Sequence, residues 1–359
     1  MAELLWKRGT TLGQGGFGVV SLASTSNALF HGVTLPSLIA VKSCNYSDSQ
    51  SLKEEEEFLG MFKHSPCIIR SFGANLSFED EVIIYNLLLE YASGGSLANR
   101  LRNCNSLPEF EVKKHTKNVL LGLSCIHTNG IIHCDIKPDN ILLVGTEETA
   151  KIADFGLSMT FEQAVKEKQE LMIRGTKRYM APELVLNYDY GPHVDIWALG
   201  CTVYELITGI PLWDGDDDHV LHQITFEKPK FQNSKLSKEA KDFLKRCLVK
   251  NPSSRWTADV LLNHPFLQNS SIVLVNTAKT RKKKSGSKSL LHKPIRKITF
   301  KFGNHKFVRQ LPDLKEVENE TCGRKRMVQE HVRSPMQAGI LPKTFFSENL
   351  ELPTTTLNS

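Results

Sequence analysis

The chain has 359 residues, of which 40% are hydrophobic and 23% are charged, a composition typical of globular proteins. No run of about 18 apolar residues occurs, and the first residues lack a basic and then apolar leader, so we expect neither a membrane span nor a secretory signal. The eight cysteines include no C-x-x-C pair, which indicates reduced thiols and a cytoplasmic or nuclear protein, or both.

The charge is distributed unevenly along the chain. Residues 270–359 contain 18 Lys and Arg against 7 Asp and Glu, a net charge of +11, whereas the whole chain carries +6. This difference leaves a net charge of −5 for residues 1–269. We therefore expect one folded domain over residues 6–267 and a basic, largely disordered tail over residues 268–359.

Residues 1–91 are expected to form strands and one helix. Two segments of strand composition, Lys7–Leu12 and Val19–Ala23, flank a glycine-rich stretch. Glycines there would let the backbone approach a phosphate closely, although a flexible hairpin without function has the same pattern. A Rossmann-type site is not favoured, because another strand follows instead of a helix. The glycines of this stretch that match the spacing G-x-G-x-x-G are Gly13, Gly15 and Gly18.

The next strand ends in Lys42, and an acidic helix is predicted to follow it. Glu55 lies three residues after Leu52 and four before Leu59, so it shares the inward apolar face of this helix. We therefore expect an ion pair between Lys42 and Glu55, with Glu56 as the alternative one residue further along.

Residues 96–267 are expected to be mostly helical. Apolar residues recur at helical spacing over residues 109–127, and the strongly apolar segment 195–208 is expected to be the central helix. Between these two helices, residues 133–140 read His-Cys-Asp-Ile-Lys-Pro-Asp-Asn, and residues 154–156 read Asp-Phe-Gly.

These two motifs predict phosphoryl transfer. A carboxylate such as Asp135 can orient an attacking hydroxyl and accept its proton. The oxygen atoms of Asn140 and Asp154 suit Mg²⁺, which prefers oxygen ligands and takes few of them from the protein. Either motif alone is common by chance, but both in this order and spacing are not.

Taken in order, the motifs resemble those of the eukaryotic serine/threonine protein kinases over roughly residues 6–267. Three phrases are similar to those of plant mitogen-activated protein kinase kinase kinases, the MEKK-like group: residues 85–97, 133–137 and 195–201. The resemblance implies an α+β fold of two lobes. A small, mainly β N-lobe with one key helix would cover about residues 6–91, and a larger, mainly α C-lobe about residues 92–267.

The resemblance also implies ATP and Mg²⁺ as cofactors, and it assigns roles to individual residues. Asp135, Lys137 and Thr176 would be catalytic, with Thr176 bonded to the other two. Asn140 and Asp154 would bind the metal. The ATP site would comprise Leu12, Gly13, Gly15, Gly18, Val20, Ala40, Lys42, Glu55, Glu90 and Ala92.

Two structural features are also implied by the resemblance. Glu183 would pair with Arg255, and Asp195 would hold the backbone of the catalytic loop.

Cys134 departs from the family pattern, because an arginine usually precedes the catalytic aspartate. That arginine belongs to a basic pocket that binds a phosphorylated activation loop. Its absence predicts that activity does not depend strongly on phosphate in the loop between Gly156 and Ala181. Lys177 and Arg178 are an alternative source of such a pocket.

The implied partners are protein substrates, namely MAP kinase kinases, with neither a membrane nor a direct nucleic-acid role. Import factors or docking partners are expected for the basic tail, in which residues 297–302 alternate polar and apolar side chains, as a short strand or docking peptide would. Two alternatives remain. A pseudokinase scaffold is disfavoured by the complete motif set, and nucleic-acid binding through residues 281–284 lacks interleaved aromatic residues.

Overall fold

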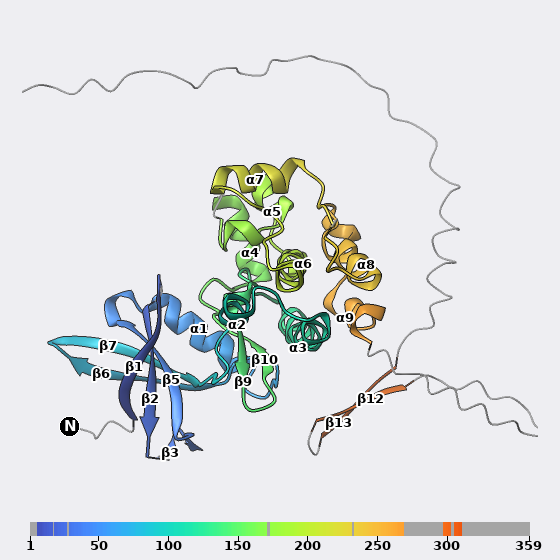
Figure 1. The fold of residues 1–359 in the computed structure, drawn as a ribbon. Coiled ribbons are helices and arrows are strands. Elements are labelled where there is room, and N and C mark those ends of the chain that lie inside the picture. The colour runs from blue at the N-terminus through green and yellow to red at the C-terminus, as the bar shows by residue number, and fades with distance from the viewer. Residues whose placement is uncertain are drawn as a thin grey trace, which may run out of the picture. The chain divides into compact units, whose positions relative to one another are not determined.

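The computed structural model describes residues 6–16, 18–26, 29–170, 173–231, 233–268, 297–302 and 305–310. The chain divides into two compact units, Met1–Leu274 and Val275–Ser359. The first unit has a strand-rich part and a helical part (Figure 1), as expected for a two-lobed α+β fold.

The strand-rich part is a five-stranded antiparallel sheet in the order β1-β2-β5-β7-β6. Its middle strand, β5, is buried over most of its length, and this position places Lys42 at the centre of the sheet. A small hairpin, β3 and β4, connects β2 to β5. The bounds are β1 (Trp6–Gly15), β2 (Gly18–Thr25), β3 (Leu29–Phe30), β4 (Val33–Thr34), β5 (Leu38–Asn45), β6 (Ser71–Glu79) and β7 (Val82–Glu90).

One helix, α1 (Gln50–Met61), lies between β5 and β6 in the sequence. Its buried residues are Leu52, Glu55, Phe58 and Leu59, spaced three and four residues apart on one face of the helix. The inward position of Glu55 that the sequence predicts is therefore confirmed.

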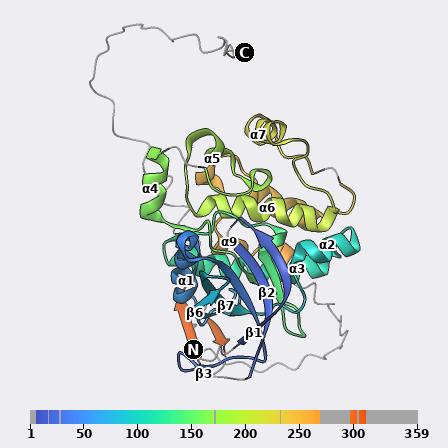
Figure 2. The same ribbon diagram turned by 90° about the vertical axis from the view of Figure 1, so that its left-hand side faces the viewer.

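The helical part is built around α6, in which 14 of 17 residues are buried. Figure 2 shows α6 running through the middle of the helical part. The apolar residues at helical spacing are buried in both long helices: Val112, Val119, Leu120, Leu123 and Ile126 in α3, and Ile196, Trp197, Leu199, Val203, Tyr204, Leu206 and Ile207 in α6. The helices are α2 (Leu97–Cys104), α3 (Glu109–Thr128), α4 (Phe161–Glu170), α5 (Pro182–Asn187), α6 (Pro192–Thr208), α7 (Asp217–Phe226), α8 (Lys238–Cys247) and α9 (Ala258–Leu261).

Short strands carry the two sequence motifs. The segment 133–140 connects β8 to β9, and the segment 154–156 begins two residues after the end of β10. The bounds are β8 (Ile131–Ile132), β9 (Ile141–Val144), β10 (Thr149–Ile152) and β11 (Met159–Thr160). Because β9 pairs with β10, the two motifs are brought together by a tight hairpin.

The structure differs from the sequence prediction in two places. The strands β1 and β2 extend through the glycine-rich stretch, and Gly15 pairs with Gly18 at their tip. The segment after Gly156, expected as a loop, contains α4. This helix forms because residues 161–170 are good helix formers without Gly or Pro, and because the Thr160 hydroxyl accepts a hydrogen bond from the Gln163 N–H.

The described residues of the second unit form one antiparallel hairpin, with β12 (Lys297–Phe302) paired to β13 (His305–Gln310). The strand that the alternating pattern allowed is therefore present. The basic run 281–284 and the expected disorder of the remaining tail fall outside the described residues.

Candidate active site

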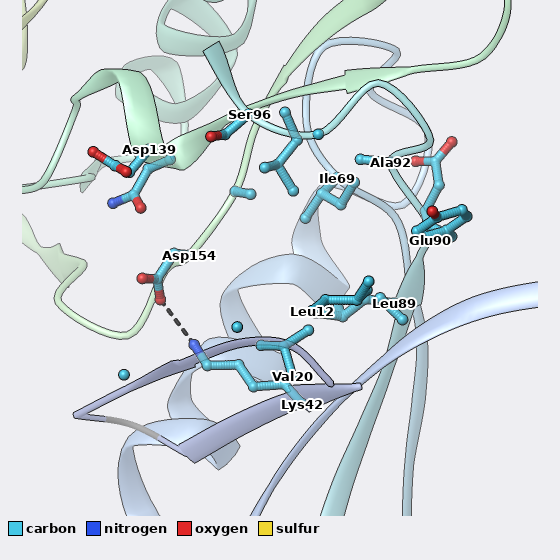
Figure 3. Close-up of a pocket in the computed structure, with 18 of the residues that line it drawn as sticks. Leu12, Val20, Lys42, Ile69, Leu89, Glu90, Ala92, Ser96, Asp139 and Asp154 are labelled. Atoms are coloured by element: carbon cyan, nitrogen blue, oxygen red, sulfur yellow. Dashed lines mark hydrogen bonds and ion pairs between the residues drawn. The ribbon is translucent and has the colours of Figure 1, made fainter. Parts of the chain in front are cut away.

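A cavity of about 690 Å³ lies between the sheet and the helical part. Residues of β1, β2 and β5 form one part of its lining, the end of β7 a second, and β9 with residues 153–154 a third. Figure 3 shows Leu12, Val20 and Leu89 around an apolar slot, with Lys42 and Asp154 meeting at its inner end. An apolar slot that leads to charged groups suits a flat ring bearing phosphates.

Gly13, Gly15 and Gly18 of the β1–β2 hairpin differ in whether the fold requires a glycine. A Cβ on Gly18 would lie 2.3 Å from the Ser43 carbonyl oxygen, and its φ is +122°, so the fold itself requires glycine there. A Cβ on Gly13 or Gly15 would meet nothing within 4 Å. These two glycines are free of packing demands and leave open space beside the cavity.

Lys42 links the sheet, α1 and the Asp-Phe-Gly segment. Its Nζ lies 2.6 Å from Glu55 Oε2 and 2.8 Å from Asp154 Oδ1. Burial disfavours the ammonium, but the carboxylates of Glu55 and Asp154 outweigh burial and raise the pKa of Lys42. Against the effect of burial, Lys42 lowers the pKa of Asp154. The lysine and Asp154 are thus both held in their charged forms.

Asp135 lies at the centre of a hydrogen-bond network. Its Oδ1 accepts bonds from the N–H and the hydroxyl of Thr176, at 3.0 and 2.7 Å. Its Oδ2 lies 2.7 Å from Lys137 Nζ and accepts a bond from Asn140 Nδ2 at 2.9 Å. Lys137 also donates to the Thr176 hydroxyl, at 2.8 Å. The contacts expected for Thr176 are therefore present, and they fix the orientation of the carboxylate.

The buried Asp195 fixes the backbone of the two residues that precede Asp135. One carboxylate oxygen accepts the N–H of His133, the other accepts the N–H of Cys134, both at 2.9 Å. His127 Nε2 lies 2.8 Å from the same carboxylate. Cys134 has a φ of +70°, a conformation unfavourable for a residue with a side chain, and the Asp195 bonds stabilise it.

The residues expected to bind a metal suit a hard cation. The Asn140 amide nitrogen donates to Asp135, which leaves the amide oxygen available, and the Ala153 N–H bonded to the Asn140 carbonyl places Asp154 beside it. Within the described ranges there is no cluster of three or more His, Cys, Asp or Glu suited to a metal. A divalent ion here would thus have few protein ligands, as is usual for Mg²⁺ bound to nucleotide phosphates.

Glu90 and Ala92 line the cavity where β7 leaves the sheet. The Glu90 carboxylate is occupied by Lys151 Nζ at 2.7 and 2.9 Å, and the Glu90 N–H donates to the Arg70 carbonyl oxygen. Ile69, Ser96 and Leu142 also line the cavity and were not predicted from the sequence. Leu142 follows Asn140 on a strand and was detectable, but Ile69 and Ser96 carried no signal in the sequence.

Farther from the cavity, Arg255 donates two bonds to Glu183, at 2.6 and 3.0 Å. Both side chains are buried, and the pair joins α5 to the segment before α9, as expected from the sequence.

Comparison with known proteins agrees with this geometry. The profile of the protein kinase domain matches residues 6–267. The chain belongs to the protein kinase family. Similar proteins of Arabidopsis thaliana include mitogen-activated protein kinase kinase kinase 20, which is 43% identical over 73% of this chain and 78% of the relative. Mitogen-activated protein kinase kinase kinase 18 is 41% identical over 75% of this chain and 79% of the relative. Mitogen-activated protein kinase kinase kinase 17 is 37% identical over 73% of this chain and 69% of the relative.

Membership in this family means phosphate transfer from ATP with the help of a divalent metal ion. Apart from Cys134, the kinase keeps the expected motif set, and nothing in the fold or the comparisons favours the pseudokinase alternative. Among the described helices, none combines the length and the apolar character that crossing a membrane requires.

Proposed function

We propose that this kinase is a MAP kinase kinase kinase that transfers the γ-phosphate of ATP to serine or threonine residues of MAP kinase kinases. The observation that carries the proposal is the Asp135 network, in which Thr176, Lys137 and Asn140 orient one buried carboxylate. The relatives at 37–43% identity support the position in the cascade.

In this proposal, Asp135 orients the substrate hydroxyl and accepts its proton, and Lys137 neutralises charge on the transferred phosphoryl group. Thr176 holds both side chains and seats the segment that carries the acceptor. Most of the rate then comes from positioning and charge stabilisation, because phosphoryl transfer needs little covalent chemistry from the protein.

Nucleotide binding is assigned to the cavity. Leu12, Val20 and Ala40 would cover the adenine, and the backbone of Glu90 and Ala92 would bond its edge. Gly13, Gly15 and Gly18 would cover the phosphates, Lys42 would bind them with Glu55 as its partner, and Mg²⁺ would be held by Asn140 and Asp154. Bound ATP and Mg²⁺ supply the phosphoryl group and neutralise its charge.

The test uses purified full-length protein with Mg²⁺, radiolabelled ATP and a catalytically inactive MAP kinase kinase as acceptor. Asp135→Asn and Lys42→Met should each lower kcat by at least about 100-fold. Asp80→Asn and Lys63→Met remove the same charges from exposed positions and should leave kcat unchanged. A well-folded wild-type protein that transfers no phosphate to any acceptor would contradict the proposal.

We place the kinase in the cytoplasm, the nucleus or both, with the basic tail serving import factors or docking partners. Support comes from the net charge of +11 over residues 270–359 and from the seven cysteines of the described residues, all of which are free. Imaging the full-length protein beside one cut after residue 270 tests this placement.

A further inference from the structure

The N-terminal half of α1 contacts the Asp-Phe-Gly segment at two points. The Ser51 hydroxyl donates to the Gly156 carbonyl oxygen at 3.1 Å, and the Phe155 N–H donates to Glu55 Oε1 at 3.3 Å. Ser51 and Glu55 are four residues apart and therefore share one face of the helix. This face fixes the backbone on both sides of Phe155, immediately after Asp154.

Other residues of α1 hold the helix to the sheet. Glu56 accepts a hydrogen bond from the Tyr85 hydroxyl on β7, and Lys53 Nζ lies 5.7 Å from the centre of the Tyr85 ring. Attachment to the sheet therefore does not depend on Ser51. The only contact described for the Ser51 hydroxyl is with Gly156, so this side chain serves the contact between α1 and the Asp-Phe-Gly segment.

This contact uses neutral groups. A phosphate on the activation segment would need cationic partners to hold α1 and the catalytic loop together, and the position before Asp135 is a cysteine. No Ser, Thr or Tyr occurs between Phe161 and Gly175. A hydroxyl-to-carbonyl bond needs neither a phosphate nor a cation.

We propose that Ser51 is a positioning residue whose hydrogen bond to Gly156 holds α1 against the Asp-Phe-Gly segment and takes the place of a phosphate-dependent link. The bond keeps Lys42, Glu55 and Asp154 in the arrangement that the structure shows. The proposal rests on the kinase function proposed above.

Three substitutions at position 51 test the bond. Ser51→Thr keeps a hydroxyl donor and should retain kcat within about twofold. Ser51→Ala removes the donor and should lower kcat about threefold to tenfold, the usual effect of one hydrogen bond. Ser51→Asp also lacks a donor, and its carboxylate would face the Gly156 carbonyl and the acidic Glu55 and Asp154, so it should lower kcat further. KM for ATP should change less than kcat, because the apolar slot is untouched.

If Ser51 served only the stability of α1, the variants would rank differently in activity and in thermal stability. Position 51 is the second residue of α1, where an aspartate is favourable to the helix dipole, and alanine has a higher helix propensity than serine. On that account, Ser51→Asp and Ser51→Ala would be at least as stable and as active as the wild type. The positioning role instead predicts unchanged or higher thermal stability together with lower kcat.

A second measurement is independent of turnover. Amide hydrogen exchange in residues 50–56 and 154–157 should be faster in Ser51→Ala than in the wild type, and restored in Ser51→Thr. Gln50→Ala is the matched control, because Gln50 is exposed and bonds only to Glu54 among the described contacts. It should change neither kcat nor exchange in residues 154–157.

The outcomes separate this proposal from the proposed function. If the wild type transfers no phosphate, the kinase assignment fails, and the exchange data alone decide the role of Ser51. If the wild type is active, any of three results overturns the Ser51 proposal. The first is wild-type kcat and amide exchange in Ser51→Ala, and the second is a higher kcat in Ser51→Asp than in the other two variants. The third is a loss of kcat in Ser51→Thr as large as that in Ser51→Ala.

Discussion

At the residue scale, buried charges are sensitive to the loss of a single partner. Arg255 is completely buried, and it donates to the Glu183 carboxylate as well as to the carbonyl oxygens of Val249 and His193. A buried ion pair of this kind adds little to stability by itself, but removing one member leaves the other charge uncompensated. The pair should therefore matter for folding much more than for the chemistry of phosphate transfer.

Arg255→Met should lower the free energy of unfolding by about 3–5 kcal/mol, because the buried Glu183 loses both bonds from its arginine and keeps only the weaker contact with His193 Nε2 at 3.6 Å. Urea unfolding followed by fluorescence measures this loss. The control is Lys230→Met, which breaks an exposed ion pair with Glu227 and should cost less than about 1 kcal/mol. Equal effects of the two substitutions would show that burial of the Arg255 pair has no special role.

At the scale of elements, the activation segment, which runs from Gly156 to Ala181, is fixed by hydrogen bonds of its hydroxyl side chains. The Ser158 hydroxyl donates to the His133 carbonyl, Thr160 caps α4, and Thr176 bonds Asp135. Lys177, considered from the sequence as part of a substitute phosphate pocket, is paired with Asp217 at 2.9 Å. Each hydroxyl of Ser158, Thr160 and Thr176 thus has a role that does not involve a phosphate.

Treatment of the purified kinase with a broad phosphatase should therefore leave kcat within about twofold, since no described contact of the segment requires a phosphate group. Mass spectrometry before and after treatment gives the phosphate content, and transfer to a MAP kinase kinase gives the rate. The prediction fails if phosphatase abolishes activity and a phosphorylated residue is found between Ser158 and Ile173.

At the scale of the whole molecule, three histidines that are fully or partly buried make stability depend on pH. Burial lowers the pKa values of His115, His133 and His193 from the usual 6.5. The unfolded chain therefore binds more protons than the folded one below about pH 6.5, and stability rises with pH across this range. The contribution is complete above pH 6.5 and is lost progressively as the solution becomes more acidic.

The melting temperature should accordingly fall between pH 7 and pH 5. His115 is 1% exposed and lies outside the active site, with Glu111 at 3.6 Å as its nearby charge. His115→Leu should reduce the pH dependence of the unfolding free energy, since it removes one of these groups. Calorimetry at several pH values measures the slope. An unchanged slope would mean that His115 does not titrate on unfolding.

The extent of the folded kinase domain is also open to test. We propose that residues 6–267 fold and act without the tail, because the compact first unit ends at Leu274. A protein cut after residue 270 should remain soluble and keep kcat within about twofold, while its location or partner choice changes. Aggregation or loss of ATP turnover would show that the tail belongs to the fold.

Much of the active site was predictable from local sequence. Glycine spacing, the two motifs around Asp135 and Asp154, and the three- and four-residue spacing of α1 each depend on neighbouring residues, and such short-range patterns are visible in a single sequence. The spacing of apolar residues around Glu55 selected it over Glu56 as the partner of Lys42, and the structure pairs these two side chains.

The tertiary structure decided what depends on contacts between distant segments. Ile69 lines the cavity only because the segment before β6 pairs with Ile152 on β10, and the Ser51–Gly156 bond joins residues 105 positions apart. No local pattern predicts such contacts, since they arise when the sheet, α1 and the hairpin of β9 and β10 pack together. Sequence alone therefore predicted the chemistry of this kinase, and packing of its elements determined how α1 is held in place.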